Sequence, residues 1–187
     1  MKKQISLSSK LIVLVIFITS ACSSIFPEDE LCELSNLLIN DESFPGEGWF
    51  ETGSRTLRGA PIRMGAGRVG TSFNHPIGGV ALNGIYYFKK VEDAENAFLR
   101  DLDYQRSLLF EGTECEDVFW FSDLLTKASE SQEYICTEPE GLKRYIAVMR
   151  YETYVVDFLA DMVVLEPADI QGILADIDDL FNICPIR

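Results

Sequence analysis

The sequence is poor in the residues that build metal and catalytic centres. It contains one histidine, His75, and none of its five cysteines stands in a CxxC pair. Zinc sites need several such ligands at short spacing, so no metal centre is predicted. A GxSxG serine motif and an EF-hand calcium loop are also missing, and no two carboxylates stand at a spacing that marks a general acid and base. The sequence therefore predicts no catalytic residue and no cofactor.

Basic charge is scarce as well. The chain has 16 Lys and Arg residues against 30 Asp and Glu residues, which gives a net charge of -14. Such a chain repels the phosphates of DNA and RNA, so nucleic-acid binding is not predicted. It also repels anionic lipid headgroups, so attachment to a membrane is expected to come from a lipid and not from a basic patch.

The longest unbroken apolar run is Leu11–Ile18. It is too short to cross a bilayer, which takes about 20 apolar residues. Lysines at positions 2, 3 and 10 precede it, and the small residues 19–21 follow it. This order of basic, apolar and small residues is typical of a secretory signal peptide, which we assign to residues 1–21, with a retained membrane span as the alternative.

The end of this segment, Thr19-Ser20-Ala21-Cys22, resembles the lipobox of bacterial lipoproteins. Ser20 and Ala21 match the small positions of that motif, and Thr19 stands where Leu is usual. The resemblance implies cleavage before Cys22 and a diacylglycerol on its thiol. Such a lipid would anchor the protein, since two acyl chains hold a protein to a membrane more firmly than one. An ordinary cleaved signal remains the alternative. We expect a tether at 22–30 and one extracytoplasmic domain at 31–187.

Four further cysteines suggest two disulfides in an exported chain. They are Cys32, Cys115, Cys136 and Cys184. The segments around Cys115 and Cys136 are predicted to be neighbouring strands of a hairpin centred between Leu125 and Thr126. Residues that pair across a hairpin have a constant index sum, so Cys115 is expected to face Cys136. Cys32 and Cys184 would form the second bridge.

A segment rich in glycine and arginine is the candidate ligand site. No acid lies between Glu51 and Glu92, and the arginines here are Arg55, Arg58, Arg63 and Arg68. Guanidinium groups and glycine-turn amides suit a small anionic ligand, so we expect these arginines to cluster around one cleft. Pairing with the chain's own acids is the alternative. The GxGxxG match at 65–70 lacks a strand before it and a helix after it, so no nucleotide is predicted.

Hydrophobic periodicity predicts three helices, at 30–40, at 92–110 and from Pro167 onward. Strands are predicted at 68–73, 80–90, 117–124, 130–137, 143–150 and 153–164. The aromatic residues Phe119–Phe121 are expected to be core residues of one of them. In the last strand, one face is expected to lie in the core and the other to be partly exposed to solvent. The fold class is α+β, with an antiparallel sheet of about five to seven strands, two long helices and one short N-terminal helix.

One stretch resembles small exported bacterial domains. Leu37 and Leu38, followed by Pro45-Gly46-Glu47-Gly48-Trp49, look like the entry from helix to first strand in exported lipoproteins and in extracellular sensor domains of receptor kinases. The resemblance implies a disulfide-stapled α+β sensor or binding domain. We therefore expect a lipid-anchored binding or accessory domain without catalysis. The alternatives are an envelope hydrolase that uses carboxylates and a structural partner in an envelope protein complex.

Overall fold

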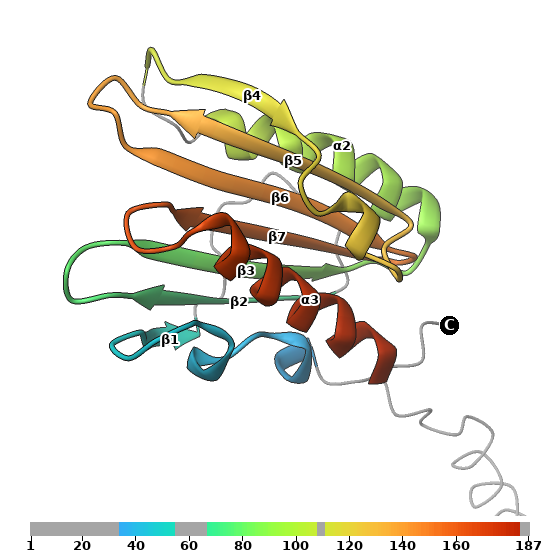
Figure 1. Ribbon diagram of the computed structural model, residues 1–187. Coiled ribbons are helices and arrows are strands. Elements are labelled where there is room, and N and C mark those ends of the chain that lie inside the picture. Colours follow the sequence, from blue (N-terminus) through green and yellow to red (C-terminus); the bar gives the residue numbers. More distant parts are fainter. Residues whose placement is uncertain (1–33, 55–66, 108–110, 184–187) are drawn as a thin grey trace, which may run out of the picture. The chain divides into compact units, whose positions relative to one another are not determined.

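One antiparallel sheet of seven strands organises the described part of the chain (Figure 1). The computed structural model describes residues 34–54, 67–107 and 111–183. The spatial order of the strands is β1-β2-β3-β7-β6-β5-β4. Their bounds are β1 Phe50–Ser54, β2 Gly67–Asn74, β3 Val80–Tyr87, β4 Glu114–Val118, β5 Glu130–Thr137, β6 Lys143–Tyr151 and β7 Tyr154–Asp161. The predicted fold class is confirmed.

Two long helices cover opposite faces of this sheet (Figure 1). They are α2, Val91–Ser107, and α3, Pro167–Ile183. Glu92 and Asp93 lie in the first turn of α2, where they complement the helix dipole. Helix α3 begins at Pro167, as predicted, and the Glu166 amide donates a 2.8 Å hydrogen bond to the Asp169 carboxylate three residues ahead.

Helix α2 explains why the last strand differs from its prediction. Even-numbered side chains of β7, such as Val156 and Phe158, pack on the α3 side, and Val155 packs on the α2 side. Asp157 is also buried. The expectation of a half-wet second face was therefore wrong, because α2 lies across β6 and β7 on that side.

The N-terminal helix is shorter and tighter than predicted. Residues of the expected 30–40 helix form a 3-10 turn, η1, at Leu34–Leu37, and a second turn, η2, follows at Asp41–Ser43. The Asn40 side chain accepts a 3.0 Å hydrogen bond from the Glu42 amide and so caps η2. Buried Leu37 and Ile39 hold the segment on the same face of the sheet as α3.

The segment after β4 is the main correction to the strand prediction. Strand β4 ends at Val118, and a 3-10 turn, η3, follows at Ser122–Leu124 in place of the expected 117–124 strand. Phe119 is 76% exposed and Trp120 is 42% exposed, so these two aromatics are not core residues. Phe121 alone of the three is buried.

Candidate functional site

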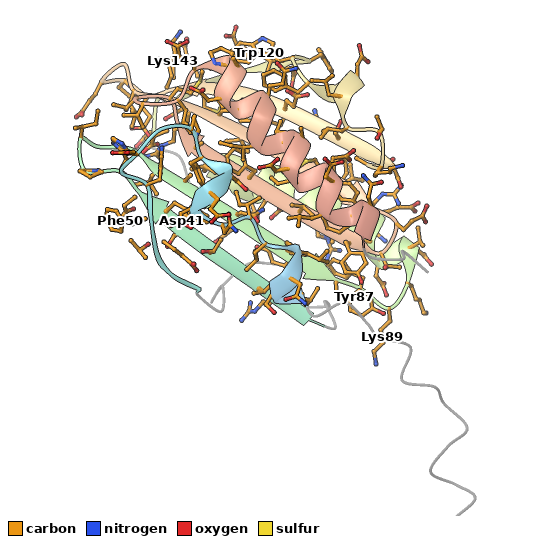
Figure 2. The ribbon with its side chains drawn as sticks, turned by 60° about the horizontal axis from the view of Figure 1, so that its bottom comes forward. Asp41, Phe50, Tyr87, Lys89, Trp120 and Lys143 are labelled. Atoms are coloured by element: carbon orange, nitrogen blue, oxygen red, sulfur yellow. A yellow bond between two sulfur atoms is a disulfide. The ribbon has the colours of Figure 1, made fainter. Side chains whose placement is uncertain are left out.

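An open groove of about 410 Å³ lies between the η1–η2 segment and α3. On one wall it is lined by Leu38, Ile39, Asn40, Glu42 and Ser43, and on the other by Asp176, Asp179 and Leu180. We call it the acidic groove. Figure 2 looks onto this face of the sheet, with Asp41 of η2 labelled beside α3.

The first wall is tied to the sheet by a buried asparagine. The Asn83 side chain of β3 accepts a 3.4 Å hydrogen bond from the Ile39 amide and donates one of 3.1 Å to the Asp157 carbonyl. Asn83 is buried, and both of its bonds go to backbone groups, so it fixes the chain beside the sheet. This anchor positions Ile39 and the polar residues that follow it.

The second wall is positioned by the buried stripe of α3. Ile173, Ile177 and Phe181 lie in the core, and the Phe181 ring stacks on Tyr151 with centroids 4.0 Å apart. This contact sets which way the helix faces, so Asp176 and Asp179, on its other side, are exposed at the groove.

The groove lacks the arginine partners that other acidic residues of the domain have. On the sheet, Arg144 lies 2.9 Å from Glu138 and 2.7 Å from Asp161, and Arg150 lies 2.9 Å from Glu130. No described residue that lines the groove is basic. Asp179 accepts a 2.9 Å hydrogen bond from the side-chain amide of Asn182, and all three carboxylates are exposed.

The loop that follows β4 is fastened by a buried glutamate. Glu133 of β5 accepts hydrogen bonds from the Phe121 amide at 3.2 Å, the Ser122 hydroxyl at 2.7 Å and the Tyr145 hydroxyl at 2.8 Å. Burial raises the pKa of Tyr145, and the neighbouring Glu133 carboxylate raises it further. These bonds turn the chain inward at Phe121, which explains why the strand stops at Val118.

Replacement of Glu133 by alanine is expected to lower the free energy of unfolding by about 2 kcal/mol, because two buried donors and one partly buried donor lose their acceptor. Glu133→Gln keeps an acceptor oxygen and is expected to cost about half as much. Urea denaturation measures both. Equal losses for the two variants would contradict the hydrogen-bonding argument, since they would assign the effect to charge.

A second buried carboxylate joins the same connection to α3. Asp178 accepts hydrogen bonds from the Thr126 amide at 3.0 Å, the Thr126 hydroxyl at 3.1 Å and the Lys127 amide at 3.2 Å. Burial raises the pKa of Tyr151, and Asp178 raises it further. Asp178 lies off the apolar stripe of α3, yet the structure buries it.

The predicted bridge between Cys115 and Cys136 is present, and these residues pair directly across β4 and β5. Cys32 and Cys184 lie outside the described residues, so the second bridge stays a prediction. The arginine cluster also stays a prediction, because Arg55, Arg58 and Arg63 lie outside the described residues. Arg68 is described, and it is exposed on β2 opposite Tyr86.

The stretch that resembles exported sensor domains is part of the core. The rings of Phe44 and Trp49 stack with centroids 4.6 Å apart, and Phe73 and His75 pack around them. Gly48 has φ +112°, and a Cβ there would lie 2.9 Å from the His75 ring, so the position requires glycine. The motif therefore positions the entry to β1, and His75 belongs to this aromatic cluster.

The site was missed at the level of sequence. Asp176 and Asp179 lie off the apolar stripe of α3, and Glu42 follows a short helix, so each has the pattern of a solvated acid. Only their placement on facing walls distinguishes them. Among the described residues, no group of three or more His, Cys, Asp or Glu side chains has the geometry to hold a metal ion.

The fold and groove define an α+β domain with helices on both faces of a seven-stranded antiparallel sheet. A solved structure with a similar fold is the extracellular domain of PknH from Mycobacterium tuberculosis, with a TM-score of 0.59 and 12% sequence identity. The match covers 84% of this chain and 97% of that one. No protein family and no curated protein matches the sequence. Within the described residues, none of the helices has the length and apolar character needed to cross a membrane.

Proposed function

We propose that this protein is an extracytoplasmic binding domain, of the sensor or accessory type, that a lipid on Cys22 holds to the bacterial cell membrane. The observation that carries the binding role is the acidic groove, whose carboxylates face a space of about 410 Å³. That volume lies within the range of small-ligand pockets. The fold similarity to an extracellular domain supports an extracytoplasmic location.

The alternative of an envelope hydrolase requires two carboxylates in a site that excludes water. Glu42, Asp176 and Asp179 are exposed along an open groove, which suits binding better than acid–base catalysis.

A structural partner role is favoured by a different observation, the exposed Phe119 and Trp120 beside β4. Exposed aromatic residues of this kind are enriched at protein interfaces.

The lipid anchor predicts a defined mass for the mature protein. Protein purified from its host membrane is expected to begin at Cys22 and to carry a diacylglycerol there. Cys22→Ser is expected to lose the lipid and to leave the membrane fraction, while the neighbouring Ser24→Ala control keeps both. Native mass spectrometry measures the modified N-terminus and any retained ligand.

An unmodified Cys22, in a cleaved or an uncleaved chain, would reject the lipoprotein assignment. Retention of a small molecule by the wild-type protein would support the binding role, and retention of a stoichiometric protein partner alone would favour the structural role instead.

A further inference from the structure

Strand β4 forms an edge of the sheet that no other described strand covers (Figure 1). The Cα atoms of Cys115 and Cys136 lie 4.0 Å apart, the short spacing of a cross-strand pair that exchanges no backbone hydrogen bonds. The next strand agrees with this, because the Glu138 amide donates a 2.8 Å bond to the Leu142 carbonyl and so directs Cys136, two residues back, at β6. The backbone N–H and C=O of Cys115 therefore point away from β5, toward the open edge.

Acidic side chains follow this edge. Glu114, Glu116 and Asp117 are exposed, and Thr137 and Ile135, which lie opposite the two glutamates on β5, carry no positive charge. Two β4 strands from separate copies of the protein would place carboxylates against carboxylates, and like charges opposite each other are destabilising. The edge therefore disfavours a second copy and favours a strand with basic side chains.

Two exposed aromatic residues, Phe119 and Trp120, follow β4 directly. The Trp120 ring lies nearly parallel to that of buried Tyr145, with centroids 6.4 Å apart, and the next residue, Phe121, is held by its hydrogen bond to Glu133. These contacts position the segment and leave Phe119 uncovered. Acids alone would only protect an edge from aggregation, whereas aromatic surface held in one place beside it is typical of a binding surface.

The acidic and aromatic parts of the edge lie on one side of the sheet. Val118 packs against the core under α3, and Tyr145, which carries the Trp120 ring, belongs to the same core. Side chains alternate along a strand, so Glu114 and Glu116 point to the side of Val118. An added strand would therefore meet carboxylates at one end and aromatic surface at the other.

We propose that β4 binds an extended basic segment of a partner protein as an eighth strand of the sheet. The backbone of Cys115 supplies main-chain pairing, Glu114 and Glu116 select basic side chains at alternate positions, and Phe119 with Trp120 covers an apolar residue. In an antiparallel segment, that apolar residue lies at the amino end. The inference rests on the accessory role proposed above and needs neither the acidic groove nor the lipid.

Calorimetry with the capped peptide Phe-Thr-Lys-Thr-Lys-Thr tests the proposal on the processed, oxidised protein in detergent at low salt. Its phenylalanine and two lysines alternate as Val118, Glu116 and Glu114 do, so saturable one-to-one binding is expected. The same peptide with an N-methyl group on its middle threonine keeps every side chain and charge. It loses the amide that would face Cys115, and it is expected to bind at least tenfold more weakly.

Variants of the protein locate the peptide. Glu114→Gln/Glu116→Gln is expected to weaken binding about tenfold, the order that two exposed ion pairs supply. The matched control, Glu42→Gln/Glu47→Gln, removes two exposed glutamates from the segment that precedes β1, at the opposite edge of the sheet, and is expected to change affinity less than twofold. Phe119→Ala is expected to weaken binding about tenfold as well.

Absence of binding would overturn the proposal. Equal affinity for the N-methylated peptide would do the same, since it excludes strand addition, and so would equal weakening by the two glutamate variants, which would show attraction by overall charge. Dimers of the wild-type protein that the peptide dissociates would assign the edge to a second copy instead. Thermal unfolding checks that every variant folds. If the peptide fails on a lipidated protein that retains a small molecule, only strand addition is rejected, whereas an unlipidated protein that retains nothing and binds no peptide rejects the proposed function.

Discussion

Replacement of both Cys115 and Cys136 by alanine is expected to lower the free energy of unfolding by about 3 kcal/mol. The bridge joins residues 21 positions apart, and cross-linking a loop of this size removes conformational freedom mainly from the unfolded chain. Among the described strands, β4 lies at the edge of the sheet and pairs with β5 alone, so the bridge holds it where few other sheet contacts do (Figure 1). Urea denaturation of the oxidised proteins measures the loss.

Amide hydrogen exchange shows which part of the domain is destabilised when the disulfide is removed. In the double variant, amides of β4 are expected to exchange faster than those of α3, because β4 opens locally at lower free energy. Oxidised wild-type protein is the matched control, because it differs from the variant in this one bridge and keeps the predicted Cys32–Cys184 bridge. If the substitution leaves both stability and β4 exchange unchanged, the bridge does not stabilise the domain.

Replacement of Phe181 by alanine is expected to lower the free energy of unfolding by about 4 kcal/mol, which would be the largest effect among these variants. The ring is 2% exposed, stacks on Tyr151 and meets Tyr154 edge-on at 5.6 Å. Its removal leaves a cavity between α3 and the ends of β6 and β7. Denaturant unfolding monitored by circular dichroism gives the measurement.

Phe119→Ala is the matched control, because the same side chain is 76% exposed there. Its expected effect is within about 0.5 kcal/mol, as for most surface substitutions. Comparable losses for the two variants would show that burial against Tyr151 is not the source of the effect. The Phe181 variant should also lose the acidic groove, since that contact orients the wall that carries Asp176 and Asp179.

Local patterns in the sequence predicted the elements that have one apolar and one polar face. The stripe through Ile170, Ile173 and Ile177 gave the correct helix, and the index sum of Cys115 and Cys136 gave the correct register. Both predictions rest on interactions between near neighbours in the chain or on a simple hairpin geometry.

Hydrophobic periodicity did not predict strand β1, although the resemblance of the Pro45–Trp49 stretch implied a first strand after it. Its five residues, Phe50–Ser54, are mostly polar or small, and the register with β2 shifts between Glu51 and Gly53. Gly53 has φ +115°, a conformation typical of a bulge and foreign to a regular strand. Such a strand has no alternation for a pattern to detect, and it forms because β2 offers an edge to pair with.

The sequence by itself determined the α+β class, the long helices and one disulfide, because hydrophobic period and residue spacing act along the chain. Tertiary structure alone decided which acids are buried anchors and which are exposed along the groove. Asp178 is buried under Thr126, while Asp176 and Asp179 line a groove with Glu42 from the other end of the domain sequence. These acids have the same local pattern. Their roles diverge because Asp178 is buried by a segment 52 residues away, whereas the groove walls come from segments more than a hundred residues apart.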